Sequence, residues 1–511
     1  MDGRDASGRR ARAALERSGV VVLLVGPTVL AFFAGGYFEL EQQWAGLIAW
    51  ALVALSVVLR PGGPGLLPRR LGGRLALAGL TLFALWTLVS FTWAPIKGDA
   101  YQAGRMVFAY VGALAAASLL FRVRGAPAVV EPALAAGALV VIGYGISERL
   151  LPGLLHFARS TSAEGRLEQP LTYWNAMGEL AALGFVLCAR LAGDLSRWRP
   201  LRAGAAAACA PLGLGLYITF SRGALFACVA GLLTVAVLAP QREQWKGLLV
   251  SLLAGAFAAL VAAPLHGVTS LAGGLATRER QGALMLVVLL VIAVVAYGAM
   301  LVLTRRPQPG TIRLPRRKGL IATVLVCAGL AGAIAVGANE QASRPLSAGA
   351  TRLVTLQSNR YAYWRVAVRA FRDEPLRGLG AGGWAVYWLR HRPFDEFAQD
   401  AHSLPLQTAA ELGLIGLLLL SAFVCGVVLA ARDAYRAAPG LASGPVAALV
   451  AYGVHAPLDW DWQMPAVTLV ALLLVAVVIV LAESDRGAQS SSATRGASRL
   501  KIHTADAQMT R

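Results

Sequence analysis

The sequence contains little charge for its length. Charged residues make up only 14% of the 511 residues, whereas hydrophobic residues make up 57%, and the mean hydropathy is +0.61. A soluble domain with one membrane anchor is excluded, because a water-exposed surface of that size needs many more polar side chains. The composition therefore predicts a polytopic membrane protein.

Cysteine and histidine are also scarce, and the common cofactor motifs are missing. The five cysteines are an odd number, and each lies in an apolar stretch, where cysteine behaves as a small hydrophobic residue. The six histidines form no HExxH pair, and the sequence has no CxxC pair and no GxxxxGK[ST] loop. We therefore expect no disulfide framework, no metal site, no nucleotide and no other cofactor.

Long apolar runs dominate what is present. A helix that crosses the bilayer needs roughly 20 mostly apolar residues, and about 12–14 stretches approach that length. They lie near residues 19–36, 44–59, 75–93, 106–121, 128–147, 176–191, 203–220, 223–239, 247–264, 282–304, 319–337, 405–430, 441–457 and 465–482. Lipid cannot satisfy backbone hydrogen bonds, so each is expected to be helical. The predicted fold is an all-α, polytopic transmembrane bundle.

Acidic residues are fewer than basic ones, with 27 Asp and Glu against 47 Lys and Arg. If the N-terminus is cytoplasmic, most basic residues fall in short inside segments, as the positive-inside rule requires. This explains the net charge of +20 without nucleic acid. The predicted organisation in the cytoplasmic membrane is a cytoplasmic N-terminus (1–18), eleven spans (19–337), a large extracytoplasmic loop (338–404), C-terminal spans (405–482) and a disordered cytoplasmic tail (483–511).

Four basic side chains reach the outer face in this orientation: Arg166, Arg222, Arg360 and His402. Their concentration on one face would be explained by an anionic ligand. Arg222 lies between two apolar stretches with almost no polar linker. It either extends its charge to the interface, or holds a phosphate with its planar guanidinium.

The long loop opens with a helical pattern. Arg360 begins the stretch RYAYWRVAVRAFRD, in which Trp364, Val368 and Phe371 recur at helical spacing. We expect an amphipathic helix that lies against the outer surface with these apolar side chains facing down.

A glycine-rich run follows at residues 378–383. No strand precedes it, so a tight turn that brings the backbone close to another segment is favoured over a dinucleotide-binding loop. Trp384 and Trp388 come next. They either stack on sugar faces or anchor the chain at the membrane interface.

His402 lies where the long loop meets the next span. It either bonds a neighbour or performs acid–base chemistry with a carboxylate to orient it. Asp400 is the nearest carboxylate in sequence, whereas Glu411 lies about two and a half turns into the next helix at 3.6 residues per turn. Glu411 is therefore expected to be too deep for direct contact and to belong to a network.

Two further polar residues stand at the outer ends of spans. Asn175 binds a phosphate or sugar, or caps its helix. Asp459 precedes Trp460, with Asp461 and Trp462 following. Carboxylates beside aromatic rings suit sugar hydroxyls, although the tryptophans alone would also suit an aromatic belt at the interface.

Taken together, these segments resemble the O-antigen ligase and polymerase family of bacterial membrane glycosyltransferases. The resemblance rests on Tyr173-Trp174-Asn175-Ala176, Ser221-Arg222-Gly223, Arg360-x3-Trp364, Pro375-Leu376-Arg377-Gly378-Leu379-Gly380, and His402 followed by Glu411-Leu412-Gly413-Leu414-Ile415-Gly416. One position departs from the pattern, because Ser403 stands where family members often have asparagine.

The resemblance implies a role in cell-envelope polysaccharide biosynthesis. The donor would be a glycan on a polyprenyl diphosphate such as undecaprenyl diphosphate, and the acceptor a hydroxyl of a glycan, lipid or protein. Arg222 and Arg360, with Arg166, would hold the diphosphate without a metal ion. His402 would activate the acceptor hydroxyl, with inversion at the anomeric carbon. The remaining expected substrate-binding residues are Asn175, Trp364, Asp400, Glu411 and Asp459.

Three alternatives stay open. A polymerase of the same family would differ only in using another repeat unit as acceptor. A transporter or flippase of glycolipids would place its functional charges near the bilayer midplane. A non-catalytic scaffold would tolerate the loss of His402 and Arg222.

Overall fold

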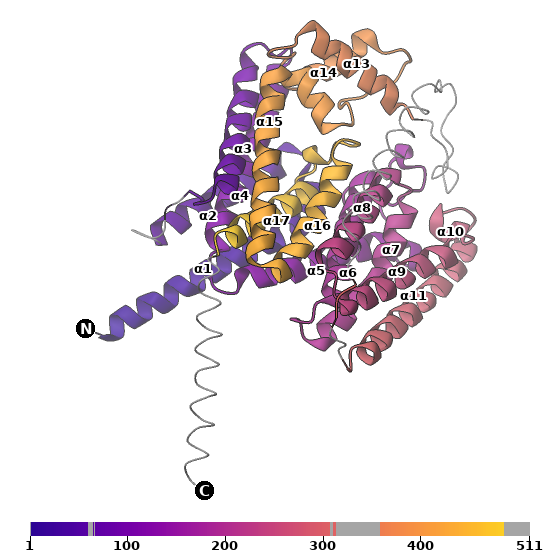
Figure 1. The fold of residues 1–511 in the computed structure, drawn as a ribbon. Coiled ribbons are helices and arrows are strands. Elements are labelled where there is room, and N and C mark those ends of the chain that lie inside the picture. The colour runs from indigo at the N-terminus through magenta and orange to yellow at the C-terminus, as the bar shows by residue number, and fades with distance from the viewer. Residues whose placement is uncertain (1, 60–64, 66, 307–309, 313–357, 485–511) are drawn as a thin grey trace.

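The structure is a computed structural model that describes residues 2–59, 65, 67–306, 310–312 and 358–484 (Figure 1). Within this part of the chain, helices form and no sheet does. The helices of the first part are α1 (Asp2–Ala31), α2 (Glu39–Leu59), α3 (Leu71–Val89), α4 (Lys97–Leu120), α5 (Ala126–Leu150), α6 (Trp174–Gly193), α7 (Arg199–Ile218) and α8 (Arg222–Leu238). Those of the second part are α9 (Arg242–Ala262), α10 (His266–Thr269), α11 (Leu275–Leu303), α13 (Arg360–Asp373), α14 (Gly383–His391), α15 (Leu404–Ala437), α16 (Pro439–His455) and α17 (Pro465–Ala482).

Eleven of these helices are long and apolar enough to cross a membrane. The predicted all-α, polytopic bundle is therefore confirmed. Two of the shorter expected spans, 44–59 and 441–457, correspond to α2 and α16. The expected span 319–337 lies outside the described residues.

Two helices form the centre of the bundle. Every residue of α6 from Asn175 to Gly193 is buried, and α17 is buried along almost its whole length. Both are mainly apolar on all sides, as expected for a helix without a solvent or lipid face, although α6 also buries Glu179 and Arg190. By contrast, the peripheral α11 buries only a stripe of residues at helical spacing, which includes Met285, Leu289 and Ile292.

Polar contacts gather at the two ends of the bundle. At one end, which we call the loop end, α13 and α14 lie together above the spans (Figure 1), and the Tyr37 hydroxyl donates to Gln399 Oε1 over 2.8 Å. At the opposite end, Glu483 accepts from the backbone N–H of Arg69 at 2.6 Å and from Arg122 at 3.3 Å. The connections between helices alternate between these ends, as expected for a chain that crosses a membrane repeatedly.

Helix α13 buries a different face from the one expected. Tyr363, Val366 and Ala370 are buried, whereas Trp364 and Val368 are only half-buried. The sequence pattern assumed that a membrane surface lies below the helix. The helix packs instead against α14 and α15, so protein side chains determine which stripe is covered.

Trp384 and Trp388 form the core under α13. Both are fully buried, and their rings stack with centroids 5.6 Å apart. The Nε1–H of Trp388 donates to the Glu396 carbonyl oxygen over 2.8 Å. Both expectations for these tryptophans, stacking on sugar and anchoring at the interface, are therefore wrong.

The glycine-rich run makes the predicted close approach. Gly378 has φ 69°, and a Cβ atom there would lie 2.4 Å from the Glu411 carbonyl carbon. The Gly380 N–H donates to the backbone carbonyl oxygen of Glu411 over 2.8 Å. Helix α15 breaks at this point, with φ 64° and ψ −161° at Gly413. The glycine run thus supplies a backbone partner that the broken helix would otherwise lack.

Candidate functional site

A cavity of about 690 Å³ opens at the loop end, and we call it the His402 cavity. The α1–α2 connection, the segment before α6, the start of α13 and the segment before α15 form its walls. Charged or titratable side chains that line it are Glu164, Arg166, Arg360, Glu396, Asp400 and His402. The cavity therefore joins segments that are far apart in the sequence.

The carboxylate of Asp459 is buried behind the cavity wall and contacts three side chains that line the cavity. Oδ1 accepts from the Tyr173 hydroxyl at 2.7 Å and pairs with His402 Nδ1 at 3.1 Å. Oδ2 accepts from Arg360 Nη2 at 2.6 Å. Burial alone would raise the pKa of Asp459, but the Arg360 guanidinium and the hydrogen bond from His402 hold that pKa well below its usual range. Asp459 is therefore ionised and fixes both a guanidinium and an imidazole.

The His402 ring is held on several sides. It stacks on Tyr363 with centroids 5.5 Å apart and contacts the edge of Trp460 at 6.3 Å. Because Nδ1 pairs with Asp459, Nε2 is the ring nitrogen that can exchange a proton with a ligand. His402 also has φ 51°, a left-handed conformation that costs a non-glycine residue energy and often marks functional sites.

Two guanidinium groups are fixed on the same cavity. Arg360, the first residue of α13, donates from Nη1 to the Leu458 carbonyl oxygen at 2.5 Å. Arg166 lies 3.7 Å above the Trp174 ring and donates from Nε to the Ala163 carbonyl oxygen at 2.8 Å. Because both side chains are held in place before any ligand binds, they are suited to bind phosphate oxygens.

Asn175 and Asp400 line this cavity as well. Asn175 does not cap α6, because its Nδ2 donates to the Tyr173 hydroxyl at 2.7 Å and so directs that hydroxyl toward Asp459. Asp400 accepts from Gln407 Nε2 at 3.1 Å. Burial raises the pKa of Asp400 above its usual value.

Three predicted site residues lie elsewhere. Trp364 supports His402 from behind by donating from Nε1 to its carbonyl oxygen at 3.3 Å. Glu411 joins a network, as predicted, because Gln407 Nε2 donates to it at 3.2 Å. Arg222 begins α8 and is not among the lining residues of the His402 cavity.

Sequence reasoning missed two polar features of the site. The first is the Tyr173 hydroxyl; a buried tyrosine needs a polar partner, which is the signal that could have found it. The second is a fully buried group next to the site, in which His455 pairs with Asp461 and its Nδ1 lies 3.9 Å from Glu179. A glutamate inside an apolar span was the available signal. Among the described residues, no group of three or more His, Cys, Asp or Glu is placed to hold a metal ion.

A second cavity, of about 570 Å³, adjoins the first, and we call it the acidic cavity. Its lining includes the carboxylates Glu39, Asp99, Asp400 and Glu411, and no lysine, arginine or histidine. Asp400 and the side chains of Tyr37 and Phe38 line both cavities. The two cavities therefore share a boundary but differ in charge.

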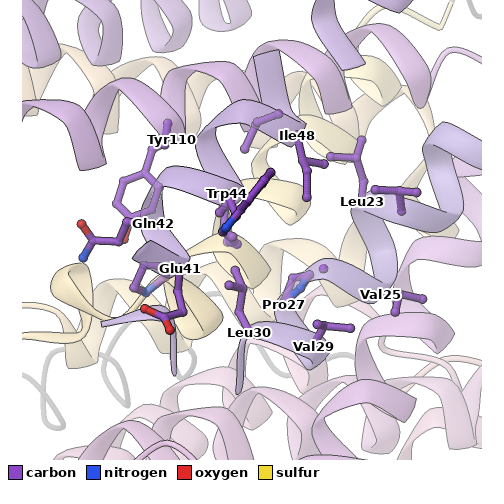
Figure 2. A pocket seen from close by; sticks show the side chains of 18 of the residues that line it. Leu23, Val25, Pro27, Val29, Leu30, Glu41, Gln42, Trp44, Ile48 and Tyr110 are labelled. Atoms are coloured by element: carbon purple, nitrogen blue, oxygen red, sulfur yellow. The ribbon is translucent and has the colours of Figure 1, made fainter. Parts of the chain in front are cut away.

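An apolar groove of about 660 Å³ runs along α1, α2, α4 and α17. Figure 2 shows Leu23, Val25 and Ile48 around it, with the polar Gln42 at one side. Val25 is 48% exposed and Ile48 47% exposed, so the groove faces the surroundings of the bundle. Gln42 also lines the acidic cavity, which connects the groove with the loop end.

Residues 265–421 match the family model described as O-antigen ligase. The match includes Arg360, Asp400 and His402, whereas Arg166 and Asp459 fall outside it. No curated protein sequence matches the chain.

Proposed function

Because its residues 265–421 assign the chain to the O-antigen ligase family of membrane glycosyltransferases, we propose that it transfers a glycan from a polyprenyl diphosphate to an acceptor hydroxyl. The observation that carries this proposal is the Asp459 carboxylate, which holds Arg360 and His402 on one cavity. A phosphate-binding group and a proton acceptor are thus fixed side by side. Glycosyl transfer from a phosphate carrier to a hydroxyl can proceed with this combination.

In this proposal the loop end faces the outside of the cytoplasmic membrane, and the N- and C-termini are cytoplasmic. The opposite end carries a buried basic network that includes Arg202 paired with Glu243 at 3.6 Å and Lys246 paired with Glu243 at 2.7 Å. Basic residues favour the cytoplasmic side of spanning helices. The His402 cavity would then open where a carrier lipid presents its glycan in the outer leaflet.

The reaction is a single displacement at the anomeric carbon. The acceptor oxygen forms its bond to that carbon while the bond from the carbon to the diphosphate oxygen breaks, which inverts the configuration. His402 Nε2 takes the proton of the acceptor hydroxyl, and the Asp459 carboxylate stabilises the resulting imidazolium. Arg360 and Arg166 bind the departing diphosphate and stabilise its negative charge. These protein groups suffice without a metal ion.

The hydrocarbon chain of the carrier occupies the apolar groove. The groove is lined by Phe33 and Leu40, which flank Tyr37 and Phe38 at the edge of the His402 cavity. A chain that lies in the groove therefore brings its diphosphate to the loop end. The exposed apolar side chains of α1 and α2 would be covered by this lipid, as burial of apolar surface favours.

The test is release of polyprenyl diphosphate by protein reconstituted in liposomes with a lipid-diphosphate-linked oligosaccharide and candidate acceptors. Wild type is expected to release it only when a suitable acceptor is present. His402→Ala and Arg360→Ala are expected to abolish release. Arg365→Ala is the matched control, because Arg365 is exposed on the same helix and lies outside the cavity lining.

The outcomes separate the proposal from its competitors. Wild type that releases nothing with any acceptor, but moves the glycolipid across the bilayer, would establish transport instead. Activity that survives both His402→Ala and Arg360→Ala would remove the assigned chemistry. Product length distinguishes a ligase, which adds one preformed glycan, from a polymerase, which extends a chain of repeat units.

A further inference from the structure

The acidic cavity has the wrong charge for the diphosphate of the donor. Four carboxylates line it, from Glu39, Asp99, Asp400 and Glu411, and no basic side chain does. Like charges at short range repel. Both guanidinium groups of the site lie in the neighbouring His402 cavity. The acidic cavity must therefore hold something other than phosphate.

A buried amide in this cavity lacks a hydrogen-bond partner. Gln42 is only 5% exposed, and its Nε2 donates to the Tyr37 carbonyl oxygen at 2.8 Å, but its Oε1 has no partner. The Oε1 of Gln463, on the same cavity, also has none. A buried acceptor without a donor destabilises the protein. A ligand with hydroxyl groups would supply the missing donors.

The rest of the lining fits a carbohydrate. Carboxylate and amide oxygens accept hydrogen bonds from sugar hydroxyls, and Gln102, Gln399 and Gln407 add further amides to the cavity. Phe38 and Phe397 in the same lining are 59% and 66% exposed and offer aromatic surface on which the apolar face of a sugar ring can pack. The volume of about 570 Å³ accommodates more than one sugar ring.

We propose that the acidic cavity is the acceptor subsite and that it binds an uncharged or amino-bearing sugar through Gln42 and the surrounding carboxylates. This assignment rests on the proposed glycosyl transfer. The attacking hydroxyl passes Asp400, which lines both cavities, and reaches His402 on the other side. The lining offers no basic side chain to pair with a carboxylate or phosphate on the bound sugar, so acceptors without such a group are expected to bind more tightly.

Two variants test the proposal. Gln42→Leu replaces the unpartnered oxygen with an apolar side chain of similar size. It also removes the Nε2–H that donates to the Tyr37 carbonyl oxygen, so KM values are compared at equal amounts of folded protein. The variant is expected to raise the acceptor KM about tenfold, as the loss of one hydrogen bond to the ligand predicts, and to change the donor KM less, because the side chain that Gln42 contributes to the groove becomes apolar. Asp99→Lys changes an exposed side chain on the cavity. This variant is expected to bind amino-sugar acceptors more weakly than wild type and to accept hexuronic acids as acceptors.

The matched control is Glu374→Lys, which makes the same change of charge at the loop end. The side chain of Glu374 is 46% exposed and lies outside the lining of both cavities, so both KM values should stay at the wild-type level. An increase of the donor KM, but not of the acceptor KM, in Gln42→Leu would assign the acidic cavity to the donor. If both cavity variants transfer the glycan with the donor KM and the acceptor KM of wild type, the cavity binds no substrate.

Binding of the acceptor alone separates this inference from the proposed function. Saturation-transfer NMR with a free neutral or amino-sugar oligosaccharide, in the absence of donor, is expected to show contact with wild type and weaker contact with Gln42→Leu. Such binding without any transfer would overturn the proposed reaction but keep the sugar subsite. Transfer by wild type with equal binding to both proteins would overturn the subsite but keep the reaction.

Discussion

Replacing Asp459 by asparagine tests how far the site depends on one buried charge. Arg360 Nη2 and His402 Nδ1 both point at this carboxylate, at 2.6 Å and 3.1 Å. An asparagine keeps the shape but presents one amide NH₂ in place of an oxygen, so at least one of these groups faces another donor. The change therefore removes the charge and also disturbs the orientation of the imidazole.

The expected loss can be worked from the two contacts. A hydrogen bond to a charged group contributes about 1.5–3 kcal/mol, so losing one or both removes about 1.5–6 kcal/mol. At 1.36 kcal/mol for each factor of ten, this corresponds to a fall in kcat of roughly 10–10⁴-fold. Tyr173→Phe removes only the hydroxyl that contacts the same carboxylate at 2.7 Å, and is expected to lower kcat about tenfold.

The assay is the rate of polyprenyl diphosphate release at saturating donor and acceptor, normalised to folded protein in the liposomes. Tyr173→Phe keeps the ring that packs 4.5 Å from Trp460, so it also controls for packing. A kcat within threefold of wild type for Asp459→Asn, at equal folded protein, would refute the role given to this carboxylate. Equal losses in both variants would show that the hydrogen bond from Tyr173, and not the charge, is what matters at Asp459.

Three further predictions concern neighbouring residues. Arg360→Lys keeps the charge but cannot contact the Leu458 oxygen, Asp459 and a phosphate together, so kcat should fall about 10–100-fold in the same release assay. Trp388→Ala should destabilise the protein by about 3–5 kcal/mol and lower its melting temperature in detergent; a changed acceptor KM with an unchanged melting temperature would contradict its place in the core. Because the pKa of Asp459 is lowered on folding by Arg360 and His402, its stabilising effect is fully present above the unfolded pKa of about 4 and is lost only as pH falls through the lower folded value. The melting temperature gap between wild type and Asp459→Asn should therefore not narrow when the pH is lowered from 7 to 5.

The bundle could be predicted because its signal is local. Apolar runs of sufficient length report spans one at a time, and even the short stretch 441–457 forms a helix, α16 (Pro439–His455). The residues that a side chain packs against are distant in sequence, and predictions that depended on them failed more often. Trp384 and Trp388 were expected to meet sugar or membrane because nothing in their neighbourhood shows that α13 lies over them.

The difference between local signals and distant packing partners also explains which residues of the site could be predicted. His402 and Arg360 could be singled out from their positions in the long loop. Their common partner could not, because Asp459 is 57 residues from His402 and 99 residues from Arg360. No spacing rule connects residues on separate helices. Only the contact of the start of α13 with the connection between α16 and α17 reveals that a single carboxylate serves both.

The break at Gly413 divides α15 into two mechanical parts. The first turns carry Gln407 and Glu411, and they are tied to the glycine run by the bond from the Gly380 N–H; beyond the break, α15 packs along α3. An interrupted hydrogen-bond ladder is the point of lowest bending stiffness in a helix. Here the backbone N–H groups of Leu414 and Ile415, beyond the break, donate to the carbonyl oxygens of Pro375 and Leu376 at 2.8 Å and 3.3 Å. The segment between α13 and α14 therefore binds both parts of α15 and braces the helix at its weakest point.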